Sequence, residues 1–213
     1  VRKSRAFTLA EFRALCSSAP PYRRLLYLFL TYTGARLNEA RTLLRSDLSF
    51  EGKPVVLFRA ENTKSSVKRS VPLKAELVAE LLPVVGNAKP DALVFRLFPS
   101  DDALHADLRR AGIERKNAAG RVLHFHAFRK TFQTWGAVSG VGQRSAQELL
   151  GHSDPSLTAN IYTDVAALAL HDEVAKIPWY KSDAPANALT DEKTSASIGA
   201  SGGIRSLLAQ IVS

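Results

Sequence analysis

Six side chains in this sequence could bind an anion or attack it: Arg36, Lys64, His126, Arg129, His152 and Tyr162. The sequence places no cluster of carboxylates suited to Mg²⁺ beside them. A site with several cations and no metal would stabilise an anionic, phosphate-like transition state directly, and the planar arginine fork suits two phosphate oxygens. A tyrosine becomes a nucleophile once a base takes its proton or nearby cations favour the phenolate.

The first of these side chains lies just after a predicted helix break at Gly34. Arg36 and Glu39 are three residues apart, so they share one edge of the next helix. They form either an exposed ion pair or an arginine that Glu39 holds toward a cleft. Lys64 lies near the tip of a predicted hairpin, where a lysine is either simply solvated or part of the same site.

The other candidates lie at helix ends. His126 and Arg129 begin a helix, where free N–H groups attract phosphate. A helix is expected to stop at Gly151, and Asp154 with Pro155 to start the next one. His152 would then lie in a tight corner, with Tyr162 roughly two turns further on.

The surrounding pattern predicts mostly helices and one small antiparallel hairpin. A capping box at Thr8 to Glu11 begins the first helix, and Pro20 and Pro21 end it. Further helices are expected over 22–33, from about 35, over 74–82, from Ser100 to Gly112, from Phe125, over 143–150 and over 164–177. The helix from about 35 would bury Leu37, Ala40 and Leu44, and Pro83 would stop the helix over 74–82. Strands are expected at 55–61 and 67–73. An aromatic stripe follows helical spacing and is assigned to the core: Phe125, Phe128, Phe132 and Trp135.

Composition favours a nucleic-acid partner. The 213 residues carry a net charge of +9 with a pI near 9.9, and the tail from 183 to 213 contributes none of that excess. A strongly basic chain outside this tail indicates that the protein binds a polyanion. The alternative is that the charge serves only solubility. Cys16, the single cysteine, falls in an apolar stripe and is expected to be a buried thiol. The sequence shows no signal peptide or apolar run long enough for a bilayer, and it does not begin with Met, which fits an excised fragment.

The C-terminal residues differ in composition. Residues 182–203 are rich in Ser, Ala, Gly, Thr and Asp, which is typical of a flexible linker after a body of residues 1–181. Residues 204–213 repeat apolar side chains at helical spacing and predict a short amphipathic helix. So short a helix needs a partner surface, either on its own body or on a neighbouring protomer.

Together these motifs resemble the tyrosine recombinase (phage integrase) family. The resemblance rests on five motifs in order: Thr33 to Glu39, Thr63-Lys64 ahead of Val71-Pro72-Leu73, His126 to Arg129, Leu149 to His152, and Ile161-Tyr162-Thr163. It covers about residues 8–177 and implies the family's catalytic-domain fold, mainly α with a small antiparallel β-sheet. It also implies cleavage and rejoining of double-stranded DNA through a 3′-phosphotyrosine, with no metal or nucleotide cofactor.

The resemblance assigns a role to each candidate. Tyr162 would be the nucleophile, Arg36 and Arg129 would bind the scissile phosphate, and His152 would donate a further hydrogen bond. Lys64 would protonate the leaving 5′-oxygen, His126 would accept the tyrosine proton or position the phosphate, and Glu39 would support the site. The family implies a cytoplasmic, nucleoid-associated protein of bacterial or phage origin without a membrane, and a tetramer on DNA joined by the C-terminal helix in trans, with docking in cis as the alternative.

Three departures from the family pattern are visible. Asp164 and Lys130 stand where histidine is frequent, and both lie outside the catalytic set. The family's N-terminal core-binding domain is missing from this chain, so weak DNA binding is expected. Three other functions remain: a DNA-binding protein that kept the fold and lost the chemistry, a relaxing topoisomerase, and a metalloenzyme using His124, His126 and His152.

Overall fold

The computed structural model describes residues 4–62, 68–151 and 170–183. The helices are α1 (Leu9–Ser18), α2 (Pro21–Thr33), α3 (Leu37–Arg41), α4 (Ala75–Val85), α5 (Asp101–Arg110), α6 (Phe125–Val138), α7 (Gln143–Leu150) and α9 (Leu170–Ala175), with 3₁₀ turns η1 (Arg45–Asp47) and η2 (Ala60–Asn62). The strands β1 (Leu48–Ser49), β2 (Val55–Phe58) and β3 (Arg69–Pro72) form one antiparallel sheet in the order β1-β2-β3. The expected class, mainly helical with a small antiparallel sheet, is therefore confirmed.

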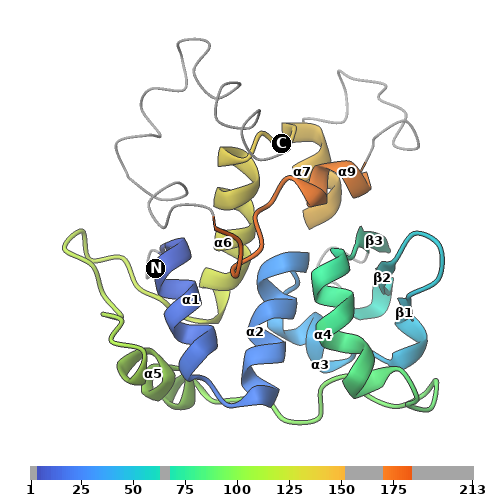
Figure 1. Ribbon diagram of the computed structural model, residues 1–213, viewed down its shortest axis with the longest axis horizontal. Coiled ribbons are helices and arrows are strands. Elements are labelled where there is room, and N and C mark those ends of the chain that lie inside the picture. The colour runs from blue at the N-terminus through green and yellow to red at the C-terminus, as the bar shows by residue number, and fades with distance from the viewer. Residues whose placement is uncertain (1–3, 63–67, 152–169, 184–213) are drawn as a thin grey trace.

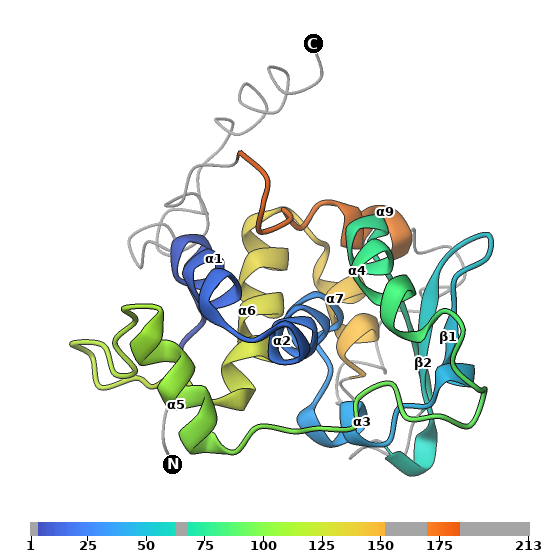
Figure 2. The same ribbon diagram turned by 60° about the horizontal axis from the view of Figure 1, so that its bottom comes forward.

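Two central helices separate the sheet from the N-terminal end of the fold. Figures 1 and 2 show α1 and α5 at one end of the molecule and the sheet with α4 at the other, with α2 and α6 between them. The contacts agree, since α2 packs against α1, α4 and α6. Arg36 follows the end of α2, and His126 and Arg129 lie near the start of α6, so the packing of α2 against α6 relates these two stretches of the chain.

Aromatic packing fixes α2 against α6. Tyr27 on α2 stacks on Phe128 of α6 with ring centroids 4.9 Å apart. Trp135, fully buried further along α6, donates from Nε1 to the carbonyl of Phe7 at 3.1 Å, which ties the N-terminal segment to the same helix. The stripe at Phe128, Phe132 and Trp135 is buried, as its spacing predicts, and Phe125 is half-buried.

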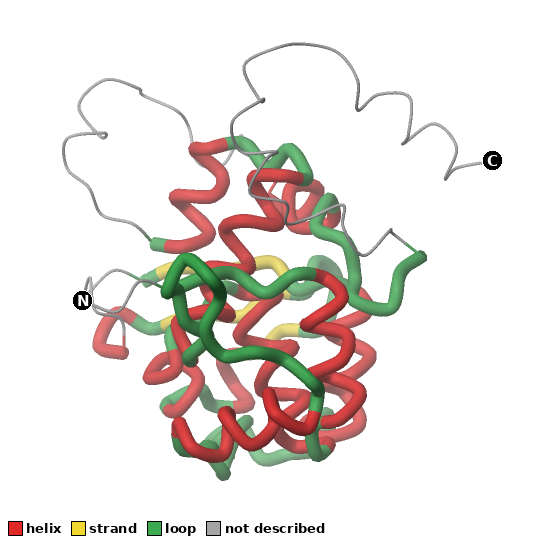
Figure 3. The backbone as a smooth tube through the Cα atoms, turned by 90° about the vertical axis from the view of Figure 1, so that its left-hand side faces the viewer, coloured by secondary structure: helices red, strands yellow, loops and turns green. Residues whose placement is uncertain are grey.

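The sheet carries the hairpin that the alternating pattern predicts. Residues 55–58 of β2 pair with 69–72 of β3, so Phe58 faces Arg69 across the ladder. The short strand β1, which pairs with the start of β2, was not predicted. In Figure 3 the strands cross the middle of the view between layers of helix, and β3 contacts both α7 and α9. This contact brings the end of the hairpin to the end of α7.

Local sequence signals correctly predicted several helix ends. At the start of α1, Thr8 accepts from the Glu11 backbone at 3.0 Å and Glu11 accepts from the Thr8 backbone at 2.9 Å, which is the predicted capping box. Ser100 caps α5, and Gly151 ends α7 in the left-handed region with φ 61°. No helix among the described residues is long and apolar enough to cross a membrane.

Three predicted boundaries were wrong. The strand predicted over 55–61 ends at Phe58, because Ala60–Asn62 form the 3₁₀ turn η2. The helix after Gly34 ends at Arg41, so Leu44 leaves the expected helical stripe, lies only partly buried and pairs in an isolated bridge with Leu93. Pro83 does not stop α4, which continues to Val85. Proline removes one N–H from the ladder, but burying Leu77, Leu81 and Val85 on one face of α4 offsets that loss.

Candidate active site

Glu39 is the centre of the candidate site. Its side chain is 1% exposed, and both carboxylate oxygens accept hydrogen bonds. The backbone N–H of Arg36 donates to Oε2 at 2.7 Å and the Arg36 guanidinium donates to Oε1 at 2.9 Å. Glu39 is therefore not half of an exposed ion pair, and it fixes Arg36 at both the backbone and the guanidinium.

A second arginine, which the sequence did not indicate, grips the same carboxylate. Arg69 at the start of β3 donates from Nη1 and Nη2 to the two oxygens of Glu39, each at 2.8 Å. Burial alone would raise the pKa of Glu39, but the hydrogen bonds and charges of Arg69 and Arg36 outweigh it and hold that pKa below its usual value. Glu39 is thus ionised at neutral pH. Arg69 could have been found only from the inward register of β3.

Arg129 joins three parts of the fold. Its guanidinium on α6 donates to the carbonyl of Gly34 at 2.6 Å and to the carbonyl of Leu150 at 2.7 Å. Gly34 ends α2 just before Arg36, and Leu150 is the last residue of α7. Arg129 is 2% exposed, and burial followed by the charges of Arg36 and Arg69 lowers its pKa to about 9. It still carries its charge at neutral pH.

His126 lies one turn before Arg129 on the exposed side of α6. Burial first, and then the charges of Arg129, His124, Arg36 and Lys130, lower the pKa of His126. The histidine is therefore largely neutral at pH 7 and able to accept a proton. His126 and Arg129 are three residues apart on α6, so they are neighbours on the surface of that helix.

The described residues give the site an excess of positive charge. Arg36, Arg69 and Arg129 contribute three cations and Glu39 one anion. Within the described part of the chain, the remaining guanidinium nitrogens of Arg36 have no hydrogen-bond partner, and 28% of that side chain is exposed. An anionic ligand could therefore reach Arg36 and offset the excess. Among the same residues no group of three or more side chains could hold a metal ion.

The structure thus brings together Arg36, Glu39, His126 and Arg129 from the predicted set. Lys64, His152 and Tyr162 lie outside the described residues, and so do the linker from 184 onward and the helix predicted at 204–213. Two described residues are their neighbours in the sequence. Gly151 immediately precedes His152, and Arg69 follows Lys64 by five positions. These two neighbours are in close contact, since a Cβ placed on Gly151 would lie 2.9 Å from Cδ of Arg69.

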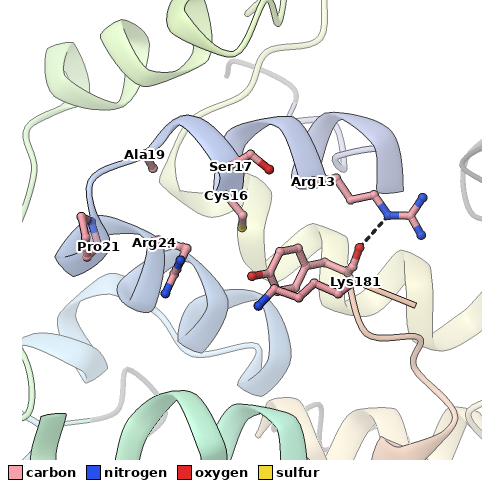
Figure 4. Close-up of a pocket in the computed structure, with 8 residues that line it drawn as sticks. Arg13, Cys16, Ser17, Ala19, Pro21, Arg24 and Lys181 are labelled. Atoms are coloured by element: carbon pink, nitrogen blue, oxygen red, sulfur yellow. Dashed lines mark hydrogen bonds between the residues drawn. The ribbon is translucent and has the colours of Figure 1, made fainter. Parts of the chain in front are cut away.

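A cavity lies apart from this cluster. It measures about 570 Å³ and lies between α1, the start of α2 and the segment after α9, with Arg13, Cys16, Arg24 and Lys181 in its lining (Figure 4). Arg13 donates to the carbonyl of Tyr180 at 2.6 Å. Cys16 is 2% exposed, and burial raises the pKa of its thiol. This cysteine is therefore the expected buried thiol and a poor nucleophile.

Comparison with known proteins defines the class. The profile of the phage integrase family matches residues 6–168. The chain is 31% identical over 153 residues to the tyrosine recombinase XerA of Saccharolobus solfataricus, covering 72% of this chain and 49% of that protein. It is 34% identical over 148 residues to the integrase of Escherichia phage 186, covering 68% of this chain and 38% of the integrase.

Solved structures agree on the fold. The catalytic domain of bacteriophage HP1 integrase superposes with a TM-score of 0.54 at 27% identity, covering 73% of this chain and 84% of that one. The crystal structure of XerA recombinase gives a TM-score of 0.59 at 21% identity, covering 74% of this chain and 60% of that one. The chain belongs to the phage integrase family, and its fold is that of the catalytic domain of a tyrosine recombinase.

The match is partial in length. This chain spans about half of each of the first three curated relatives it matches, at 49%, 58% and 51% of their lengths. The resemblance stated from the motifs is confirmed at the level of family and fold.

Proposed function

We propose that this protein is a site-specific DNA recombinase or integrase that cleaves and rejoins double-stranded DNA through a 3′-phosphotyrosine intermediate. The observation that carries the proposal is the cluster of Arg36, Arg69 and Arg129 near the single buried carboxylate of Glu39. A cluster with more cations than anions, beside a neutral histidine, suits an anionic phosphate. The family membership and the basic charge of the chain support the same substrate class.

The reaction proposed for this site balances without a redox step. The phenolate oxygen of Tyr162 attacks the scissile phosphorus, so that a bond from phosphorus to the tyrosine oxygen forms and the bond to the 5′-oxygen breaks. His126 accepts the phenol proton or positions the phosphate, and Lys64 donates a proton to the leaving 5′-oxygen. The free 5′-hydroxyl of a partner strand then attacks the phosphotyrosine, which reverses these bond changes and reseals the DNA.

The positive groups serve the charge that develops on phosphorus. Arg36 binds the non-bridging oxygens, His152 adds a hydrogen bond, and Arg129, whose guanidinium is buried against two backbone carbonyls, contributes its charge to the pentacoordinate state. Glu39 fixes Arg36 and does not touch the phosphate. No metal or nucleotide cofactor is part of the proposal, because the phosphotyrosine conserves the energy of the broken bond.

The arrangement beyond the catalytic body is also proposed. Residues 1–181 form the catalytic domain, 182–203 a linker, and 204–213 a helix that docks in cis or in trans within a tetramer on DNA. Sedimentation of the chain on DNA, with and without the residues after Lys181, distinguishes the two. An unchanged assembly state in the shortened chain would exclude docking in trans.

The function is tested with nicked duplexes that trap a covalent product. A pool of duplexes with a random central sequence and a nick beside each cleavage position is incubated with the protein and run on a denaturing gel. We expect a slow, protease-sensitive DNA band with the parent and none with Tyr162→Phe. A parent that shifts DNA on a native gel but forms no covalent band would favour the DNA-binding protein without chemistry. Cleavage of the pool without sequence enrichment would favour a relaxing topoisomerase.

A further inference from the structure

We propose that Arg69 is a positioning residue for DNA cleavage, a buried brace that holds Glu39, and through it Arg36, against the end of α7. This inference rests on the proposed function and adds a residue to it. Arg69 is outside the set of side chains that the motifs indicated. It acts on the phosphate only through other groups, because its own side chain is 5% exposed.

Arg69 completes the hydrogen bonding of Glu39. The carboxylate accepts four hydrogen bonds, two from Arg36 and two from Arg69. Two oxygens offer about four lone-pair positions, so the pairing leaves Glu39 no freedom to turn toward another donor. Arg69 donates one bond to each oxygen, and this two-point contact restricts the rotation of the carboxylate and hence the direction of the Arg36 guanidinium.

The same guanidinium also reaches α7. Its Nε donates to the carbonyl of Leu149 at 3.1 Å, two residues before the glycine that ends the helix. Gly151 has φ 61° and lies so close that a Cβ there would meet Cδ of Arg69 at 2.9 Å. One side chain therefore fixes β3, α3 and the end of α7 relative to one another. In sequence these elements adjoin Lys64, Arg36 and His152.

Packing holds Arg69 in this orientation from its other face. The guanidinium carbon lies 4.1 Å from the ring centroid of Phe58, its partner across the β2–β3 ladder. The ring covers the guanidinium while the three edge contacts use its N–H groups. Lysine cannot replace this arrangement, because an ammonium has no planar fork and cannot serve Glu39 and Leu149 together.

The test is a double-mutant cycle on cleavage. Arg69→Met, Glu39→Gln, the double variant and the parent are compared by the single-turnover cleavage rate at saturating DNA, on the nicked site enriched from the pool. Misplacement by about 1 Å can cost on the order of 10²-fold in rate, so we expect a loss of about 100-fold in Arg69→Met. Because Arg69 acts through Glu39, the double variant should be no more than about twofold slower than the slower single variant. Arg69→Lys should recover only part of the rate.

A remote pair is the matched control. Arg23 on α2 grips Asp107 of α5 with bonds of 2.7 and 2.9 Å, much as Arg69 grips Glu39. Arg23→Lys should lower the thermal midpoint and leave the cleavage rate of the folded protein unchanged. All rates are compared at temperatures where melting curves show each variant folded. A parental rate in folded Arg69→Met, or independent effects of Arg69 and Glu39, would overturn the proposal.

A second readout does not need cleavage. Arg36→Ala should weaken DNA binding in a mobility-shift assay, and the weakening should be smaller in the Arg69→Met background, where Arg36 is no longer held. An equal effect of Arg36→Ala in both backgrounds would contradict the positioning role. If the parent forms no covalent product, the proposed function fails, while this comparison still decides the role of Arg69.

Discussion

Individual side chains in the cluster differ in how they can meet a phosphate. Arg36 is partly exposed and keeps guanidinium nitrogens without partners among the described residues, whereas Arg129 is buried and donates to two backbone carbonyls. In the proposed reaction, Arg36 is therefore the more direct phosphate ligand. Arg129 contributes its charge and fixes the ends of α2 and α7 at the same point.

In the proposed reaction, the proton-accepting role of His126 predicts a pH dependence whose direction follows from its lowered pKa. The neutral imidazole is the form that accepts a proton, so the second-order cleavage rate at limiting DNA should fall as pH drops below 6.5 toward the lowered pKa. Measuring this rate against pH for the parent and His126→Gln tests the assignment. The glutamine variant should be slower and should lose the acidic limb. An acidic limb that persists unchanged in the variant would assign it to another group.

At the scale of elements, both the backbone conformation and the close approach of Arg69 favour glycine at the end of α7. Gly151→Ala meets both left-handed backbone strain and a contact with Arg69 at 2.9 Å. Gly112→Ala is the matched control, because that residue has φ 69° and no atom within 4 Å of the added Cβ. Urea unfolding should show a loss of about 1–2 kcal/mol for Gly112→Ala from backbone strain alone. We expect a larger loss for Gly151→Ala, and equal losses would show that Arg69 moves aside freely.

The contact between α2 and α5 depends on a buried carboxylate. Asp107 is 0% exposed and accepts from Arg23, Arg110 and, at 2.9 Å, Tyr27. Breaking such a buried pair costs about 3–5 kcal/mol, and we expect Asp107→Asn to lose stability at the lower end of that range because amide hydrogen bonds remain. Asp102→Asn, on the exposed start of the same helix, is the control and should change little.

The pH dependence of that loss has a definite sign. Burial alone would raise the pKa of Asp107, but its hydrogen bonds to Arg23 and Tyr27 and the charge of Arg23 lower it below the usual 3.8. The carboxylate thus stabilises the fold above pH 3.8, and this contribution is lost as pH falls toward the lowered pKa. Urea unfolding at several pH values should show the gap between parent and Asp107→Asn closing on acidification. A gap that does not change would contradict the assignment.

Local signals in the sequence explain what could be predicted and what could not. The capping box at Thr8, the glycine at 151 and the aromatic stripe of α6 depend on neighbouring residues, and all three were predicted. Pro83 was misjudged because tertiary burial of the α4 face outweighs one missing hydrogen bond. Arg69 was missed because its partners, Glu39 and Leu149, are distant in sequence, and a strand pattern alone does not show which buried arginine has found a carboxylate.

At the scale of the whole molecule, the net charge predicts how strongly the proposed binding to DNA depends on salt. The chain carries a net charge of +9, and each phosphate that lysine or arginine neutralises releases counterions. Fluorescence anisotropy with a labelled duplex should show affinity falling by about 10³-fold or more between roughly 50 and 200 mM salt. Binding to an uncharged duplex analogue of the same sequence is the control and should vary little with salt. A flat titration on normal DNA would contradict a phosphate-based interface.

The most direct test of the account identifies the covalent bond itself. The trapped complex is digested with nuclease and protease, and the peptide that carries a nucleotide is sequenced by mass spectrometry. The account predicts one modified residue, Tyr162, joined to a 3′-phosphate, with a free 5′-hydroxyl on the released strand. A nucleotide on any other residue, or a 5′-phosphate linkage, would contradict it.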